Sequence, residues 1–554
     1  MVIMFKDRTA RALSLVSGLS WMLTIIFLLG QAKSFFSFVA PMARWWCNFS
    51  SYCQSDTTAF LAYLHIHTQK LLIVTSLALS LFTLCYILLV RFSDVEKYDA
   101  SELTRPKVCS WELGLLFLFV VLGAILRLRG MTRGFTYDEL FTTVHFVETK
   151  SFWQTISSYL VFNNHLFYSV AARFSWLLIG RGEWVVRLPS FLAGLLAIPI
   201  FWCFLREWVD EQSALLATFF LAIHPMHIVM SRSARGYSFL ALGTLVTSWL
   251  FFRLLENGRA SLCPYYVLSI SLMVWGHLYG VIVVLCQALA LLWYLWQWQT
   301  PRNNLRFIWL SIGLSGVVTI LLYLPVLPLL LLELGREKSG VFDSAFMFNV
   351  LTQFLWTPSA AVLALVLIFF LWTIYDQRKE KTTFLHLLYL CAPLLMAWAL
   401  KMRAVGFARF ALFALPSFLW FISLGVSRLA ARLCKERRYI FPLILVLLVA
   451  PYWVSKGWFE LDCSGFRQAL AAVPKDVALC ALGGDAYLFA YYGHGRMTVP
   501  KNEADFYKIL KREKVLYCIF HDVSWASAFH RRLYSRYGKS AQPFGDVYFF
   551  KVSP

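Results

Sequence analysis

Two adjacent carboxylates, Asp138 and Glu139, stand in a short polar stretch at residues 133–140 that follows a long apolar run. A carboxylate held beside an acceptor hydroxyl can take its proton and so act as a general base. The same stretch also fits a structural pattern, because Thr136 and Glu139 have the spacing of a capping box that starts a helix at about Tyr137. Both interpretations can hold together. Neighbouring helical residues point about 100° apart, so Glu139 could cap the helix while Asp138 faces a cavity.

A second polar cluster, Asn163-Asn164-His165, precedes apolar residues that recur at helical spacing as far as Leu178. This pattern is typical of a helix that lies in the membrane interface. We therefore expect residues 129–183 to form two interfacial helices that bring the carboxylates and the Asn/His cluster into one layer. Taken alone, His165 fits a hydrogen-bonded surface histidine better than a catalytic one.

Cationic and aromatic side chains recur at the ends of later apolar segments. They are His224, Arg232, Arg235, Tyr237, His277, Tyr279, Lys401, Arg403 and Arg409. Charge near the bilayer core is costly without a partner, and few acidic residues are near these positions in the sequence. Because arginine binds phosphate oxygens in pairs, the pattern predicts a bound phosphate. The first candidates are Arg235, Arg403 and Arg409, and the next is Arg133.

The composition indicates which elements position these groups. Of the 554 residues, 59% are apolar and 15% are charged, and the mean hydropathy is +0.64. Soluble domains carry about 45–50% apolar and about 25% charged residues. These values exclude a soluble globular enzyme, a disordered chain and a disulfide-stapled secreted module. The expected fold class is a mostly α polytopic membrane protein with a small C-terminal α/β domain.

A helix needs about 20 apolar residues to cross a bilayer, and about thirteen segments qualify. They lie at about 12–30, 70–91, 111–128, 184–206, 213–230, 237–255, 264–280, 281–298, 307–332, 350–374, 384–400, 408–427 and 439–455. The division of 264–298 depends on a tight turn at Trp275 to Gly280.

The basic residues give the orientation. Lysine and arginine gather before the first span and in the loops at 378–381 and 428–438. All three groups fall on one side, which the positive-inside rule makes cytoplasmic. The net charge of +21 therefore indicates a membrane protein without a nucleic-acid partner. We expect a multi-pass protein of the cell (inner) membrane with a cytoplasmic N-terminus and an extracytoplasmic C-terminus.

Three parts are expected. They are residues 1–104 with two extra N-terminal spans and an outer loop, the transmembrane module 105–455, and an extracytoplasmic α/β domain at 456–554. The twelve cysteines show no Cys/His spacing typical of zinc sites. Cys47 and Cys53 lie in a polar loop and could pair if that loop faces an oxidising compartment.

Three motifs follow one another after the predicted span at 111–128. They are Phe135-x-Tyr137-Asp138-Glu139, Asn163-Asn164-His165-x-x-Tyr168 and Gly180-x-x-Glu183-Trp184-x-x-Arg187-x-Pro189-Ser190. Their order and spacing resemble bacterial glycosyltransferase family 39 of the GT-C superfamily, which is related to protein O-mannosyltransferases and to the aminoarabinose transferase of lipid A. The resemblance covers about residues 105–430.

This resemblance implies an inverting transfer of a sugar, hexosyl or pentosyl, from a polyprenyl-phosphate donor to a hydroxyl of a lipid, a glycan or a protein, with no cofactor. It implies that Asp138 is catalytic, with Glu139 beside it. The expected substrate-binding set is Asn164, His165, Arg133, Arg235, Tyr237, His277, Tyr279, Arg403 and Arg409.

The chain also departs from the related proteins. Residues 1–100 lie ahead of the usual family start, and Leu140-Phe141 follow the acid pair where the aminoarabinose transferase has an arginine. Nothing therefore favours lipid A as the acceptor. Related oligosaccharyltransferases bind a metal through further acidic motifs, but Glu333, Glu337 and Asp343 are weakly patterned, so no required metal is predicted. A lipid-linked sugar transporter and a non-catalytic scaffold remain as alternative functions.

Overall fold

The computed structural model describes most of the chain after residue 107. The described ranges are 108–149, 151–159, 164–297, 302–327, 329–330, 360–378, 380–399, 408–433, 440–459, 465–474, 477–482, 486–492, 497–500, 502–521, 528–537, 541–544 and 547–553. The predicted spans at 12–30 and 70–91, the cysteine pair Cys47 and Cys53, and Arg403 lie outside these residues.

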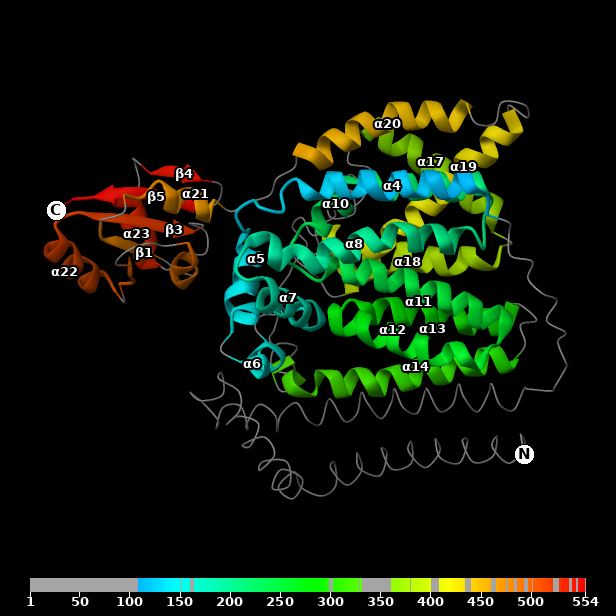
Figure 1. The fold of residues 1–554 in the computed structure, drawn as a ribbon, viewed down its shortest axis with the longest axis horizontal. Helices are drawn as coiled ribbons and strands as arrows, with labels where there is room; N and C mark the ends of the chain where they lie inside the picture. The colour runs from blue at the N-terminus through cyan, green and yellow to red at the C-terminus, as the bar shows by residue number, and fades with distance from the viewer. Residues whose placement is uncertain are drawn as a thin grey trace, which may run out of the picture.

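The described part of the membrane module is helical throughout. Its long helices are α4 (Ser110–Leu128), α8 (Glu183–Leu205), α9 (Glu211–Ile223), α10 (Pro225–Ser231), α11 (Tyr237–Asn257), α12 (Cys263–Gly276), α13 (Gly280–Gln297), α14 (Arg302–Tyr323), α17 (Ala360–Gln377), α18 (Lys381–Ala399), α19 (Leu415–Leu433) and α20 (Ile440–Phe459). Short 3₁₀ turns at Ala260–Leu262, Leu324–Val326 and Ala408–Ala414 precede α12, follow α14 and precede α19. These helices run side by side in one bundle (Figure 1).

Every predicted span from 111–128 onward overlaps one of these helices. Six stretches of the described chain are long and apolar enough to cross a membrane, and a bent pair would make a seventh. These helices make the chain a multi-pass membrane protein, while the total of about thirteen spans stays a prediction. The turn between α12 and α13 lies at residues 277–279, as predicted.

The predicted span at 213–230 is not one straight helix. Its two halves, α9 and α10, meet at an angle of 55°. Pro225 begins α10, and a proline forces the preceding residue out of the helical region. His224 accordingly has φ −64° and ψ 122°.

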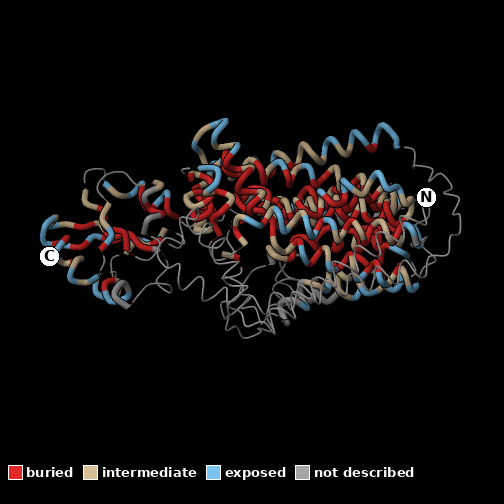
Figure 2. The backbone as a smooth tube through the Cα atoms, turned by 90° about the horizontal axis from the view of Figure 1, so that it is seen from below, coloured by how far each residue is buried: buried red, intermediate tan, exposed pale blue. Residues whose placement is uncertain are grey.

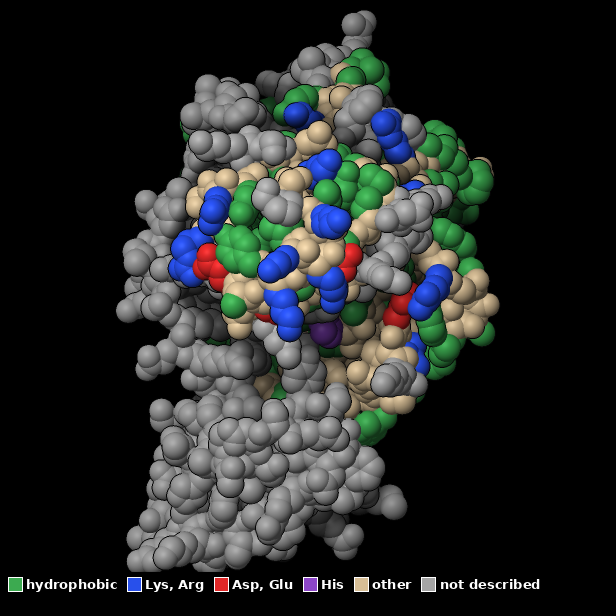
Figure 3. Space-filling view, turned by 90° about the vertical axis from the view of Figure 1, so that its left-hand side faces the viewer, with side chains coloured by type: hydrophobic (Ala, Val, Ile, Leu, Met, Phe, Trp, Pro, Cys, Tyr) green, Lys and Arg blue, Asp and Glu red, His purple; other side chains and the backbone are tan. Residues whose placement is uncertain are grey.

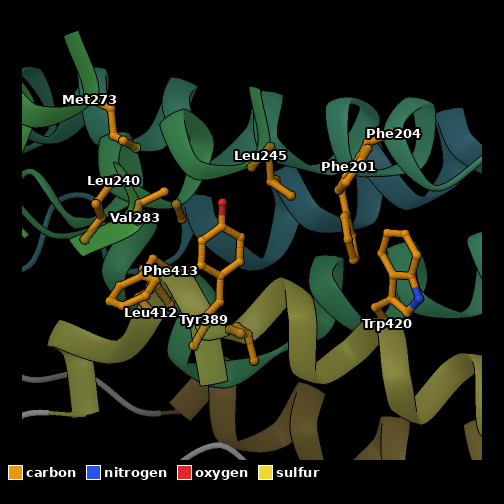
Figure 4. Close-up of a cluster of buried hydrophobic side chains, with 14 of the residues drawn as sticks. Phe201, Phe204, Leu240, Leu245, Met273, Val283, Tyr389, Leu412, Phe413 and Trp420 are labelled. Carbon is orange, nitrogen blue, oxygen red and sulfur yellow. The ribbon is translucent and has the colours of Figure 1, made fainter. Parts of the chain in front are cut away.

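Apolar contacts between helices fill the bundle interior, which Figure 2 shows as a continuous buried zone. Helix α11 lies near the centre and packs against α8, α12 and α14. Figure 4 shows one contact region, where Tyr389 of α18 lies beside Leu412 and Phe413 and points its hydroxyl toward α11. The Tyr389 hydroxyl lies 2.9 Å from the Ser248 hydroxyl, so this buried polar group has a partner.

The described residues between 130 and 182 form short helices at one end of the bundle, here named the α5 end (Figure 1). They are α5 (Tyr137–Thr142), a π-helical turn η2 (Thr143–Val147), α6 (Phe152–Ser157) and α7 (Leu166–Ile179). Three short helices therefore replace the two that the sequence predicted. The last turn of α7 exposes Leu177, Leu178 and Ile179.

The C-terminal residues form a five-stranded sheet beyond the α5 end (Figure 1). Its order is β2-β1-β3-β5-β4, parallel between β2, β1 and β3 and antiparallel from β3 through β5 to β4. The strands are β1 (Leu479–Leu482), β2 (Met497–Thr498), β3 (Leu516–His521), β4 (Gln542–Phe544) and β5 (Val547–Val552), and the helices are α21 (Phe466–Ala471), η7 (Ala486–Tyr491), α22 (Glu503–Glu513) and α23 (Ala528–Tyr537). Figure 3 looks at this end, where lysine and arginine side chains spread over the surface.

Both faces of this sheet are buried, and the two-residue period of a strand divides them. Cys480 and Leu482 pack with residues of α22 and α23. Leu479 and Ala481 instead belong to a core that also contains Phe135 and Leu140 from the α5 end. One apolar core therefore joins the sheet domain to the segment that carries the acid pair.

Candidate active site

Helix α5 begins with the predicted capping box. The Thr136 hydroxyl accepts a hydrogen bond from the Glu139 amide at 3.4 Å, and the Glu139 carboxylate accepts one from the Thr136 amide at 2.9 Å. Tyr137 is the first helical residue, so the structural interpretation of this motif is confirmed. Asp138 follows Tyr137 and directs its carboxylate away from this cap, toward Arg409.

Glu139 is fully buried, and both of its carboxylate oxygens are occupied. Arg187 of α8 binds it with Nε and Nη2, each at 2.8 Å, and the Ala234 amide donates to it at 2.8 Å. Arg133 lies at 3.6 Å. Burial raises the pKa of Glu139, but Arg133, Arg187 and the hydrogen bonds from Arg187 and Thr136 outweigh burial and lower the pKa below its ordinary value. Both oxygens of this carboxylate already accept hydrogen bonds, which favours a positioning role for Glu139, and its catalytic role stays a prediction.

Arg187 organises the whole turn that precedes α5. Its guanidinium donates to the backbone carbonyls of Met131 at 2.9 Å, Arg133 at 2.7 Å and Gly134 at 3.2 Å, in addition to Glu139. The side chain is completely buried. Sequence reasoning included Arg187 in a motif but gave it no role. The sequence offered one indication of this role: Arg187 lies near the start of a predicted span, where a buried charge needs an acidic partner.

Asp138 is the accessible member of the acid pair. Its carboxylate lies 3.1 Å from Nη2 of Arg409, and both side chains are partly exposed, 29% and 28%. Arg409 belongs to the 3₁₀ turn Ala408–Ala414 that leads into α19. Residues more than 250 positions apart in the chain are thus brought together at the α5 end.

Four aromatic side chains pack together next to Arg409. The rings of His165 and His277 stack with centroids 4.5 Å apart, and Tyr237 lies 4.9 Å from His277. His277 also stacks on Tyr279 at 5.3 Å. The Arg409 guanidinium is 5.7 Å from the Tyr237 ring centroid. We name these four residues, with Arg235 and Arg409, the His/Tyr cluster.

Arg235 approaches the same cluster from the turn before α11. Its guanidinium lies 5.9 Å from the Tyr237 ring centroid and donates to the Thr142 hydroxyl at 3.1 Å. Burial, Arg235 and Arg409 lower the pKa of His277 to about 3. Burial, Arg235, His277 and Arg409 likewise hold the pKa of His165 well below its ordinary value. Both histidines are therefore neutral near pH 7.

The neutral state and one hydrogen bond fix the tautomer of His277. Its Nδ1 lies 3.2 Å from the Tyr279 amide, which can only donate, so Nδ1 is the acceptor. The proton of a neutral imidazole is then on Nε2. That Nε2 and the Tyr237 hydroxyl are buried and have no hydrogen-bond partner among the described residues. A buried donor without a partner costs free energy, so this pair favours a ligand that supplies acceptor oxygens.

Some of the predicted substrate-binding residues make hydrogen bonds or ion pairs within the protein. The Asn164 amide donates to the carbonyls of Thr155 at 3.1 Å and Ser158 at 2.7 Å and accepts from the Ser169 hydroxyl. It therefore ties the start of α7 to α6, and its contact with substrate stays a prediction. Arg133 faces Glu139 behind the acid pair. His165 is buried at the start of α7, not at the surface, because Gly236 lets its ring pack closely.

A bound metal ion would need several nearby side chains as ligands. Among the described residues, no group of three or more His, Cys, Asp or Glu side chains could hold a metal ion. The weakly patterned acids Glu333, Glu337 and Asp343 lie outside the described residues.

Comparisons with known proteins give a partial family match and a shared fold. Residues 166–327 match the family model of dolichyl-phosphate-mannose-protein mannosyltransferase, which includes Arg187, Arg235 and His277 but not Asp138. The search of curated proteins gave no match.

Two solved structures share the fold. The oligosaccharyltransferase AglB from Archaeoglobus fulgidus, in complex with an inhibitory peptide and a dolichol-phosphate, is 14% identical over 80% of this chain and 74% of its own, with a TM-score of 0.50. ArnT from Cupriavidus metallidurans, bound to undecaprenyl phosphate, is 14% identical over 80% of this chain and 98% of its own, with a TM-score of 0.50. The family match over residues 166–327 and the shared fold agree with the resemblance found in the sequence.

Proposed function

We propose that this protein transfers a sugar from a polyprenyl-phosphate donor to a hydroxyl acceptor, with Asp138 as the general base. One observation carries the proposal: the accessible carboxylate of the acid pair lies 3.1 Å from Arg409, inside a cluster rich in hydrogen-bond donors. The α5 end would then face the extracytoplasmic side, as the basic loops predict. The acceptor can be a lipid, a glycan or a protein, and the sugar a hexose or a pentose.

The reaction needs one base. The acceptor oxygen attacks the anomeric carbon, and Asp138 takes the hydroxyl proton as the new carbon–oxygen bond forms. The bond between the anomeric carbon and the phosphate oxygen breaks, and the polyprenyl phosphate leaves with the electron pair. Attack from the face opposite the leaving group inverts the anomeric configuration. No covalent intermediate is required, which agrees with an acid pair in which Asp138 is accessible and Glu139 is buried.

The leaving group needs donors that are already in place. Negative charge grows on the phosphate as the bond breaks, and preorganised donors stabilise it. Arg409 and Arg235 supply charged donors, and Nε2–H of His277 and the Tyr237 hydroxyl supply neutral ones. Arg403 remains a candidate from the sequence. Donors predominate over acceptors in this set, which suits phosphate oxygens.

The known relatives support this assignment by their chemistry. The matched family is described by a dolichyl-phosphate sugar donor, and the two solved structures of the same fold hold dolichol-phosphate and undecaprenyl phosphate. AglB also holds a peptide. These ligands belong to those proteins; for this chain they support the class of donor and leave the sugar and the acceptor open.

The test uses the purified full chain and a panel of radiolabelled polyprenyl-phosphate sugars. Wild type should release or transfer the sugar from one donor, and Asp138→Asn should lower the rate by about 100-fold or more. Asp210→Asn is a matched control, because Asp210 caps α9, away from the site, and asparagine caps equally well. Full activity of Asp138→Asn would refute the role of Asp138. No reaction of wild type with any donor, together with donor binding, would favour a transporter.

A further inference from the structure

Two side chains of the C-terminal sheet domain bind the segment that leads into α5. The Tyr492 hydroxyl accepts a hydrogen bond from the Phe135 amide at 3.0 Å. Arg467 donates to the Thr132 carbonyl at 2.9 Å. Asp138 lies only three residues after Phe135, so these contacts fix the backbone immediately before the proposed base.

Apolar packing reinforces both hydrogen bonds. Phe135 is fully buried, and its ring meets Tyr491 at 5.6 Å and Tyr492 at 6.4 Å between centroids. Gly134 lies so close to Arg467 that an added Cβ would stand 3.2 Å from the Cβ of Arg467. The sheet domain therefore packs directly on the segment that leads into α5.

The same two side chains also bind the start of α8. Both Tyr492 and Arg467 reach Oε1 of Glu183, at 3.3 Å and 3.2 Å. One helical turn later, Arg187 holds Glu139 and the carbonyls of the turn before α5. The sheet domain thus contacts both partners, the α5 segment and the helix that clamps it.

We infer that Tyr492 and Arg467 are positioning residues for Asp138, so that the C-terminal domain completes the active site. This inference rests on the proposed function. Tyr492 holds the Phe135 amide, Arg467 holds the Thr132 carbonyl, and Glu183 ties both to α8. Losing one contact lets the segment shift, and a shift of about 1 Å at a catalytic group can cost about 100-fold in rate.

The test compares Tyr492→Phe with Tyr507→Phe in the full-length protein. Tyr492→Phe keeps the ring and removes the hydroxyl, which accepts from the Phe135 amide and donates to Glu183. Tyr507 is a matched control, since its hydroxyl accepts a hydrogen bond from the exposed Arg536 and lies on α22, on the other face of the sheet from Phe135. Two measurements are made: steady-state transfer kinetics and hydrogen–deuterium exchange of the peptide that contains Phe135.

In Tyr492→Phe, the Phe135 amide should exchange its hydrogen about tenfold faster than in wild type. The kcat should fall about tenfold, while KM for the donor changes less than about twofold. Arg467→Lys, which keeps a donor, should retain more activity than Arg467→Met. Unchanged exchange, or faster exchange with a wild-type kcat, would overturn the inference. If wild type transfers no sugar, the proposed function fails instead; faster exchange would then still support the positioning of the segment, and unchanged exchange would overturn it.

Discussion

Glu139→Gln separates the roles of the two adjacent acids, because it should destabilise the fold where Asp138→Asn should not. Each Glu139 oxygen accepts two hydrogen bonds: Oε1 from Arg187 Nε and the Ala234 amide, and Oε2 from Arg187 Nη2 and the Thr136 amide. Glutamine replaces one oxygen by an NH₂ group, so two donors lose their acceptor. It also leaves the fully buried Arg187 without its counter-charge.

The magnitude follows from these losses. Two hydrogen bonds to a charged group contribute about 1.5–3 kcal/mol each, or about 3–6 kcal/mol together. Removing one member of a buried ion pair costs about 3–5 kcal/mol. We therefore expect Glu139→Gln to lower the free energy of unfolding by about 3–5 kcal/mol. Chemical unfolding in detergent micelles, followed by circular dichroism, measures this difference directly.

The pH dependence gives a second, independent readout. Glu139 has a lower pKa in the folded protein than the ordinary 4.5, since its arginine partners outweigh its burial. Its contribution to stability is therefore fully present above pH 4.5 and is lost as the pH falls toward the folded value. The stability difference between wild type and Glu139→Gln should shrink on acidification below this pH.

Glu148→Gln provides the control for this prediction. Glu148 lies in the same segment, pairs at 3.3 Å with the exposed Arg181 and accepts a hydrogen bond from Trp176. A pair of this kind contributes about 0–1 kcal/mol. If Glu139→Gln costs no more than Glu148→Gln, or if its cost does not shrink in acid, the assignment of Glu139 as a buried anchor is refuted.

Three further predictions concern the His/Tyr cluster. Arg409→Met should lower kcat/KM for the donor about 100-fold, whereas Arg428→Met, which breaks a comparable ion pair on α19 away from the site, should leave transfer kinetics unchanged. His277→Gln should lower kcat about tenfold, and because the pKa of His277 is about 3, the wild-type pH–rate profile should show no step from this group between about pH 5 and 8. Gly236→Ala places a Cβ 2.8 Å from that of His165, so it should reduce donor binding, measured by titration, and cost about 1–3 kcal/mol of stability.

The sequence was sufficient for the features that depend on local pattern. Apolar runs located the helices, the spacing of Thr136 and Glu139 predicted the start of α5, and Pro225 was present at the bend that the span prediction overlooked. Each of these follows from the residues within one or two helical turns. Burial of His165 and the structural use of Asn164 do not, since both depend on which helices pack against α7.

Long-range contacts explain what the sequence could not predict. Arg187 and Glu139 are separated by 48 residues, and Tyr492 and Phe135 by 357. No periodicity connects such positions, and a tyrosine in a polar tail has many ordinary roles. The motif located the acid pair. The separate roles proposed for Asp138 and Glu139 depend on which carboxylate oxygens already accept hydrogen bonds, and the sequence does not show this.

The contrast between the two ion pairs explains why Asp138, and not Glu139, suits the proposed chemistry. The Glu139–Arg187 pair is completely buried and shares its atoms with several backbone groups, so no ligand can replace either partner. The Asp138–Arg409 pair is joined at 3.1 Å, and both side chains are more than a quarter exposed. Its attraction is weaker because water screens it. A phosphate in the cluster would compete for Arg409 and release the Asp138 carboxylate, which could then accept a proton. Binding of the donor would thus prepare the base.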